Sequence, residues 1–206
     1  MFNFGPQFFV YECDYPNKIS LIDHIQQRHA SQIIRKPSTW DEDVHTSIVY
    51  DKYITPKDYF HKAEIPEDLT ILLDRIVQDF ILDQNLQSLG KFQISEMWYN
   101  AYSYGQYQHM HKHSNGNNNI FSGVYYLKFD PTQHSSTRFY NPSFEIDFDK
   151  VRSNTYFVLQ PTVKENQVII FPSDIGHDVP QQISDQLRIT ISFNIQCIYN
   201  EPMQYT

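Results

Sequence analysis

The sequence has few cysteines, an excess of acidic over basic residues and no long apolar stretch. Only Cys13 and Cys197 are present, too few for a disulfide framework, and this favours a reducing compartment. The first residues, MFNFGPQFFVYE, contain neither a basic region nor a long apolar run, so they do not resemble a signal peptide. No segment approaches the ~18 consecutive apolar residues of a membrane span. We therefore expect a soluble, cytoplasmic protein.

The charge of the chain argues against one large class of partners. Asp and Glu number 24 against 16 Lys and Arg, which gives a formal net charge of -8 at pH 7. A protein that binds nucleic acid through its phosphates needs a basic face. We therefore do not expect a nucleic-acid partner.

Aromatic residues, by contrast, are abundant, with 15 Tyr and 15 Phe. Aromatic side chains fit the pleated surface of a β-sheet, so this composition favours a mainly β protein. A chain of 206 residues can bury the core of one domain. We predict a single domain over residues 1–206, with a helical support region at 1–90 and a β core at 91–200.

Two helices are predicted in the N-terminal region, after a short strand from Phe8 to Tyr11. The first runs from Lys18 to about Ile34, and the segment from 37 to 62 is polar and irregular. The second begins at Pro66, a favoured first-turn residue, and is expected to stop at Gly90. Its apolar residues recur at helical spacing and should pack against a sheet: Leu69, Leu72, Leu73, Ile76, Val77, Phe80 and Ile81. Inward candidates on the first helix are Ile19, Ile22, His24 and Ile25.

After Gly90 the chain consists of short strand-like segments broken by turn residues. About seven such segments follow one another with no helical pattern between them, which predicts an antiparallel sandwich or barrel. They include FQISEMWYNAYSY, FSGVYYLKF, NQVIIFP and LRITISFNIQCIY.

Three histidines stand at alternate positions in the segment QYQHMHKHSNGNNN, which starts at Gln106. Alternate residues of a strand share a face, so His109, His111 and His113 can point the same way. Two neutral imidazoles at this spacing can bind one transition metal, with a third ligand from elsewhere in the fold. Alternation alone allows either His109 with His111 or His111 with His113. It also allows a polar, solvent-facing edge strand.

A second polar pattern lies about sixty residues further on, in VIIFPSDIGHDVPQQISDQLRITISFNI. His177 follows a buried-looking strand and a turn. Arg188 then opens a strand whose polar face also carries Thr190, Ser192 and Asn194. A guanidinium with a hydroxyl two residues further on suits the binding of a carboxylate in a lined cavity, although Arg188 could also be a surface arginine. The opposite, isoleucine-rich face is expected inside the sandwich.

Together, the HxH motif, SGVYYL, FPSDIGHDV and RITISFN resemble the 2-oxoglutarate- and iron(II)-dependent oxygenases. The similarity extends from about Met97 to Asn194, and is greatest to a small branch in bacteria and phages that is related to prolyl-hydroxylase-type enzymes. It implies a double-stranded β-helix, a cupin-like jelly-roll, behind N-terminal helices. It also implies Fe(II) as cofactor and 2-oxoglutarate as cosubstrate. For a phage protein, the compartment would be the host cytoplasm.

The resemblance assigns roles to individual residues. His111 matches the first metal ligand of these enzymes, and His177 matches the distal histidine. Arg188 matches the basic residue that pairs with the far carboxylate of 2-oxoglutarate, and Thr190 matches the hydroxyl of the Arg-x-Ser/Thr pattern.

Further positions match the cosubstrate side of the family's pocket. Tyr126, the second tyrosine of VYYL, matches a tyrosine that contacts the same carboxylate, and Tyr102 matches another cosubstrate-side tyrosine. Trp98, Asn100 and Asn194 are expected as cavity walls.

One position departs from the family pattern. The usual motif is His-x-Asp/Glu with a distant histidine, whereas this chain has a histidine in the place of the carboxylate. The preceding YGQYQ aligns better when His111 rather than His109 is the first ligand, so we interpret His111, His113 and His177 as a three-histidine site. A neutral third ligand leaves the metal one charge more positive than a carboxylate would.

These residues predict a dioxygenase that hydroxylates a small molecule or a protein side chain. The loop from Ser114 to Ile120 is expected to cover the cavity mouth. Two alternatives stay open. One is a three-histidine dioxygenase without a cosubstrate, in which Arg188 holds a carboxylate of the substrate. The other is a non-catalytic, cupin-like metal-binding protein.

Overall fold

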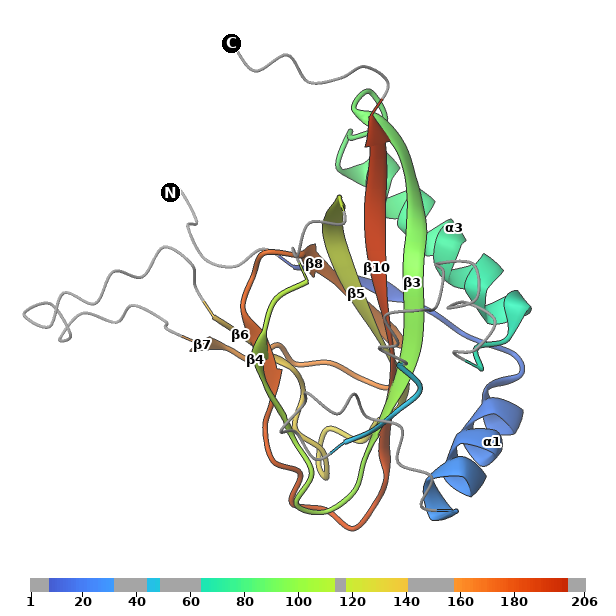
Figure 1. Cartoon of the computed structure of the whole chain (residues 1–206), viewed down its shortest axis with the longest axis vertical. Helices are drawn as coiled ribbons and strands as arrows, with labels where there is room; N and C mark the ends of the chain where they lie inside the picture. The colour runs from blue at the N-terminus through green and yellow to red at the C-terminus, as the bar shows by residue number, and fades with distance from the viewer. Residues whose placement is uncertain (1–7, 32–43, 49–63, 114–117, 141–157, 200–206) are drawn as a thin grey trace, which may run out of the picture.

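The computed structural model describes residues 8–31, 44–48, 64–113, 118–140 and 158–199. Two helices and ten strands lie within these ranges (Figure 1). The N-terminal elements are β1 (Phe9–Glu12), α1 (Lys18–Ala30), β2 (His45–Thr46) and α3 (Glu67–Asp83). The remaining strands are β3 (Gly90–Tyr102), β4 (Gln108–His111), β5 (Asn119–Lys128), β6 (Arg138–Tyr140), β7 (Val158–Leu159), β8 (Gln167–Pro172), β9 (His177–Val179) and β10 (Arg188–Tyr199).

The strands form two sheets in which all the described pairs are antiparallel. The larger sheet has six strands in the order β1-β8-β5-β10-β3-β2, and the smaller has four in the order β4-β9-β6-β7. Figure 1 shows the smaller sheet on one side of the larger and the two helices on the other. The prediction of a mainly β, antiparallel architecture with N-terminal helices is confirmed.

Both helices cover the outer face of the larger sheet. The apolar stripe predicted for α3 is buried against that face, except that Leu72 is only partly covered. On α1 the buried residues are Leu21, Ile22 and Ile25. Ile19 is 66% exposed and the His24 side chain is half exposed, so the prediction that these two face inward was wrong.

Helix α3 ends at Asp83, seven residues before the predicted stop at Gly90. Asn85 adopts a left-handed conformation (φ 55°), and the Leu86 amide donates to the Ile81 carbonyl at 3.0 Å. This geometry closes a helix in the manner of a Schellman turn, with asparagine in the place of glycine. Gly90 instead begins β3, where a Cβ would lie 2.3 Å from the carbonyl oxygen of Ile198.

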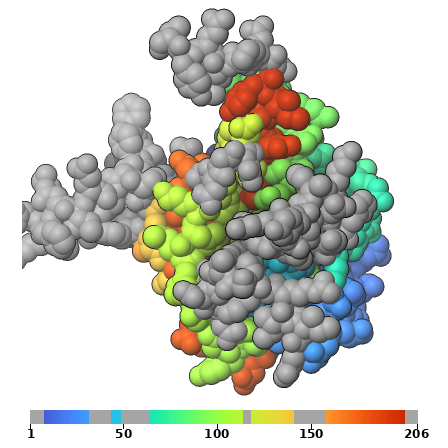
Figure 2. All heavy atoms as spheres, viewed as in Figure 1, coloured from blue at the N-terminus to red at the C-terminus, as the bar shows by residue number. Residues whose placement is uncertain are grey.

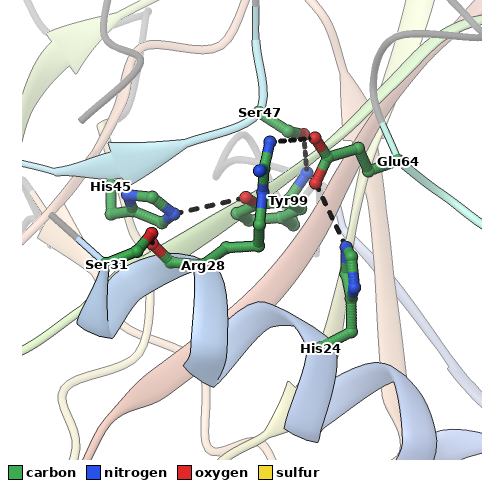
Figure 3. Close-up of polar contacts among 7 residues, drawn as sticks. All are labelled: His24, Arg28, Ser31, His45, Ser47, Glu64 and Tyr99. Carbon is green, nitrogen blue, oxygen red and sulfur yellow. Dashed lines mark hydrogen bonds and ion pairs between the residues drawn. The ribbon is translucent and has the colours of Figure 1, made fainter. Parts of the chain in front are cut away.

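Polar contacts connect α1 with Glu64, just before α3, and β2 with β3 (Figure 3). Glu64 accepts from Arg28 and lies 3.1 Å from His24 Nε2. On the sheet side, the His45 ring on β2 lies 3.2 Å from the Tyr99 hydroxyl. These contacts flank the apolar core beneath α1.

The outer face of β10 is covered by the helices rather than by the second sheet. Ile189, Ile191, Phe193 and Ile195 are fully buried in one cluster with the apolar residues of α1 and α3. The prediction that they pack inside the sandwich was therefore wrong. The polar face of β10 points between the sheets, beside a separate apolar cluster formed by Val124, Tyr126, Phe129, Phe139, Val163, Ile169, Phe171 and Ile175.

The space-filling view in Figure 2 shows a lime-green surface that includes β4 on the side of the molecule away from the blue α1 and the turquoise α3. None of the helices in the described residues is long and apolar enough to cross a membrane.

Candidate metal centre and adjoining cavity

A β-bulge decides which residues of β4 face the interior. Gln108 pairs with Val179 and His111 pairs with His177, so two residues of β4, His109 and Met110, lie opposite the single residue Asp178 of β9. Because the extra residue shifts the alternation, Gln108 and His111 face the same side, and both line the cavity between the sheets. His109 is exposed on the outside, with its ring 4.9 Å from that of Tyr107. Strict alternation, which would align His109 with His111, does not hold here.

The structure brings together His111, His113 and His177. Their ring centroids are 4.3 Å apart for His111 and His177, 4.9 Å for His113 and His177, and 5.1 Å for His111 and His113. One nitrogen from each ring lies within 4.8 Å of the others. His113 lies just past β4, where its amide donates to the Ser173 carbonyl at 2.9 Å. Three imidazole nitrogens at this separation are a donor set that suits iron.

Each of the three rings has its Nδ1 atom directed at a hydrogen-bond acceptor. Nδ1 of His111 lies 2.8 Å from the His109 carbonyl, and Nδ1 of His177 lies 3.0 Å from the Ile175 carbonyl. Nδ1 of His113 lies 2.6 Å from the side-chain oxygen of Asn194. Carbonyl oxygens only accept, so each Nδ1 donates and each Nε2 keeps its lone pair for a metal.

Burial and mutual repulsion favour the neutral form of His113 and His177. Burial, followed by repulsion from His111, lowers the pKa of His113 to about 4. The same causes hold the pKa of His177 well below its usual value. These two rings are therefore ready to bind a metal at neutral pH without first losing a proton.

A buried arginine lines the same cavity as the three histidines. Arg188 is 1% exposed, and its Nε and Nη1 atoms have no hydrogen-bond partner. Its guanidinium carbon lies 4.8 Å from the ring centre of Tyr102, 5.6 Å from Tyr126 and 5.9 Å from Phe129. Within the described ranges, no carboxylate forms an ion pair with it. A buried cation with free donors costs free energy unless a ligand pairs with it, and a carboxylate of 2-oxoglutarate would do so.

The other predicted cosubstrate residues lie close to Arg188. Thr190 is buried and lines the cavity. Tyr102 also lines it, and its hydroxyl donates to Gln108 at 2.9 Å. The Tyr126 hydroxyl donates to the hydroxyl of Thr137 at 3.1 Å, and it is Thr137 that reaches the cavity wall. Tyr126 therefore lies behind this wall, against the guanidinium.

The predicted cavity walls divide into two groups. Trp98 and Asn100 line the cavity, and the Asn100 amide lies 3.2 Å from the Ser192 hydroxyl. Asn194 instead contacts His113. Of the loop expected to cover the mouth, residues 114–117 lie outside the described residues.

Sequence reasoning missed Gln108, Thr137 and Glu96. Gln108 was missed because no pattern in the sequence marks the bulge, and Thr137 because it lies in a short segment without periodicity. Glu96 was detectable, because alternation from Trp98 along β3 places it on the inner face. Its carboxylate accepts from the Asn194 amide at 2.7 Å.

Comparison with known protein families supports this picture. Residues 96–194, about half of the chain, match the sequence model of a family described as "Putative 2OG-Fe(II) oxygenase". This segment contains all three clustered histidines and Arg188. The chain belongs to this family. It is therefore an oxidoreductase that uses Fe(II) and 2-oxoglutarate, as the motifs predicted. Among curated proteins, no sequence matches the oxygenase.

Solved structures with the same fold include several oxygenases. A Pseudomonas putida prolyl-4-hydroxylase has a TM-score of 0.60 at 14% identity, covering 94% of both chains. A Trichoplax adhaerens prolyl hydroxylase in complex with a peptide fragment has a TM-score of 0.58 at 12% identity, covering 92% of this chain and 83% of the other. HygX from Streptomyces hygroscopicus, with nickel, 2-oxoglutarate and hygromycin B bound, has a TM-score of 0.56 at 10% identity, covering 94% and 84%. The predicted double-stranded β-helix is confirmed.

Proposed function

We propose that the oxygenase hydroxylates a small molecule or a protein side chain, with Fe(II) bound by His111, His113 and His177. The three Nε2 atoms converge from β4, the residues just after it, and β9. Three protein ligands would leave the remaining coordination positions of the metal for the cosubstrate and oxygen. Oxygen would be the oxidant, 2-oxoglutarate would supply two of the electrons that reduce it, and the protein supplies position and environment.

A buried arginine with unpaired donors is the observation that carries this proposal. Arg188, with two unpartnered nitrogens, lines the same cavity as His111, His113 and His177. A molecule with an oxo-acid group at one end and a carboxylate at the other would pair with both. We propose that Arg188 and Thr190 contact the far carboxylate, with Tyr102 beside them. The Tyr126 ring holds the guanidinium from behind.

The residues around the cavity also exclude water. Trp98 is 4% exposed and its ring centroid lies 5.6 Å from that of His113. Val124 and Val179 line the same cavity. In such low-polarity surroundings, the charge pairing between Arg188 and a carboxylate is stronger than in water.

The substrate class rests on the charge of the chain and on its structural relatives. The net charge of -8 disfavours a polyanionic nucleic acid. One neighbour is named for a complex with a peptide fragment, and another for a complex with hygromycin B. We therefore propose a peptide side chain or a small molecule as substrate.

The decisive experiment is succinate release by iron-loaded protein supplied with 2-oxoglutarate and oxygen, with and without panels of peptides and small molecules. Succinate above the level of a His177→Ala control supports the proposal, and release stimulated by one panel identifies the substrate class. A companion titration under anaerobic conditions follows the visible absorption that appears when 2-oxoglutarate binds the iron. Iron binding without either signal would favour a cosubstrate-free dioxygenase or a non-catalytic metal-binding protein.

A further inference from the structure

Asn194 links the carboxylate of Glu96 to His113, the histidine that stands where the family motif usually has a carboxylate. Nδ1 of His113 lies 2.6 Å from the Asn194 side-chain oxygen, and the Asn194 amide nitrogen donates to Glu96 at 2.7 Å. Ser122 also donates to the Asn194 oxygen, at 3.0 Å. Asn194 is 4% exposed and Ser122 is fully buried, whereas Glu96 is half-buried.

The strand register builds this arrangement. Asn194 on β10 is the direct cross-strand partner of Glu96 on β3 and of Ser122 on β5. The pairing of β10 with β3 shifts by one residue immediately after Asn194, because Ser95 is an extra residue on β3 without a partner in the register. Cross-strand partners have their Cβ atoms only about 5 Å apart, so the three side chains form a row on the inner face of the sheet.

The Glu96 carboxylate sets the direction of the hydrogen bonds from His113 through Asn194. An ionised carboxylate only accepts hydrogen bonds, so Glu96 draws the Asn194 amide nitrogen toward itself. The amide oxygen then faces His113, whose Nδ1 must carry the proton. Nε2 is left without a proton, as a metal ligand requires.

His113 differs in this respect from the other two histidines. Nδ1 of His111 and Nδ1 of His177 donate to backbone carbonyls, which are acceptors in any sequence. The tautomer of His113 depends instead on side chains. In addition, a histidine in this position does not supply the negative charge that a carboxylate ligand would supply.

We propose that Glu96 is a positioning residue that acts through Asn194 to set the tautomer of His113 and to supply negative charge near the metal. This inference rests on the proposed function in taking His113 as a ligand. It goes further by naming the residues that make a histidine workable at that position.

Three variants separate polarity and charge from packing. Glu96→Gln keeps the size of the side chain but removes the charge, and its amide lets Asn194 rotate. Asn194→Leu breaks the row. Glu96→Gln combined with Asn194→Asp exchanges the carboxylate and the amide, so that a negative acceptor faces His113 directly and receives a hydrogen bond from position 96. The matched control is Glu12→Gln, which removes an exposed carboxylate that contacts Gln167 on the edge of the sheet.

Two measurements read the effect without relying on turnover. Nitrogen-15 NMR of the imidazoles in metal-free protein reports which ring nitrogen of His113 carries the proton. Titration with Co(II) gives the metal affinity and the ligand-field spectrum. We expect wild type and Glu12→Gln to show a single Nδ1–H tautomer and equal affinities.

The inference predicts a mixture of tautomers in Glu96→Gln with about tenfold weaker Co(II) binding. It predicts a loss of about ten- to a hundredfold in Asn194→Leu, the range typical for groups that orient metal ligands. The exchanged pair should recover to within about threefold of wild type.

An Nε2–H tautomer of His113 in wild type would overturn the inference, as would unchanged tautomer and Co(II) affinity in Glu96→Gln. Failure of the exchanged pair to recover, in folded protein, would show that packing rather than polarity matters. The tautomer is read without metal or cosubstrate, so this arm judges the inference even if wild type releases no succinate.

Discussion

Replacing Arg188 by methionine should separate the cosubstrate from the metal. Methionine has a similar length and no charge, so it fills the space beside Tyr102 and Tyr126 without donating hydrogen bonds. The guanidinium is 1% exposed, and two of its nitrogens have no partner. Its interaction with a ligand is therefore little screened by water.

The size of the effect follows from this burial. Removing one side of a desolvated, charge-assisted pair costs roughly 2–5 kcal/mol, because the other charge is left unpaired. At ~1.4 kcal/mol per tenfold, the affinity for 2-oxoglutarate should fall on the order of a hundredfold or more. Lysine at position 188 should restore only part of the affinity, because it keeps the charge but loses the planar fork. Metal affinity should hardly change, since Arg188 is not among the clustered histidines.

The same substitution should act with the opposite sign on the ligand-free protein. A buried guanidinium without a partner destabilises the fold, and its replacement by an apolar side chain of similar volume is often neutral or stabilising. We expect the Tm of metal-loaded, cosubstrate-free Arg188→Met to equal or exceed that of wild type. Added 2-oxoglutarate at concentrations below the weakened Kd of the variant should raise the Tm of wild type only, because a ligand at free concentration L stabilises the fold by RT ln(1 + L/Kd).

The assay is an anaerobic titration of iron-loaded protein with 2-oxoglutarate, followed by calorimetry and by thermal melts. Arg75→Met, an exposed helical position, is the matched control for loss of one positive charge. Equal 2-oxoglutarate affinity in wild type and Arg188→Met, with iron confirmed in both, would refute the assignment.

Three further predictions concern the metal centre and the core. His111→Ala should abolish metal binding and His109→Ala should retain it, as read by metal analysis after dialysis; the reverse result would show that the site uses the other register. The pKa of His113 is about 4 against about 6.5 in an unfolded chain, so its neutral form contributes stability above about pH 6.5 that is lost as the pH falls toward 4. The urea midpoint of metal-free wild type should decrease over that range by more than that of His113→Gln, and equal slopes would contradict this sign. At Gly123 an added Cβ would lie 2.1 Å from the phenyl ring that packs on it, so Gly123→Ala should lower the free energy of unfolding by about 1–3 kcal/mol. Gly176→Ala, where the nearest atom is 3.5 Å away, is the control, and equal losses in the two would argue against overpacking.

The elements that depend on local pattern were predictable. The alternation of Arg188, Thr190 and Ser192 with isoleucines holds along β10, because a strand turns successive side chains to opposite faces. The stripe of α3 is buried as its spacing predicted. The HxH, FPSDIGHDV and RITISFN motifs also indicated the family.

Two other features did not follow from the sequence pattern. The end of α3 at Asp83 depends on Asn85 adopting a left-handed conformation, which asparagine tolerates less well than the glycine that was expected to stop the helix. The apolar face of β10 is covered by helices, and nothing in the strand's own pattern distinguishes a helix layer from a second sheet.

The strand-rich composition, the two faces of β10 and the residue types of the site could be predicted from the sequence, because each follows from side-chain chemistry and short-range periodicity. Which histidines meet depends on the tertiary structure. The bulge between β4 and β9 turns His109 outward and Gln108 inward. This bulge arises from pairing with a strand some seventy residues away, so the sequence around the histidines does not predict it. The contact of His113 with Asn194 likewise joins residues 81 positions apart, and strand register, which the linear pattern does not encode, brings them together.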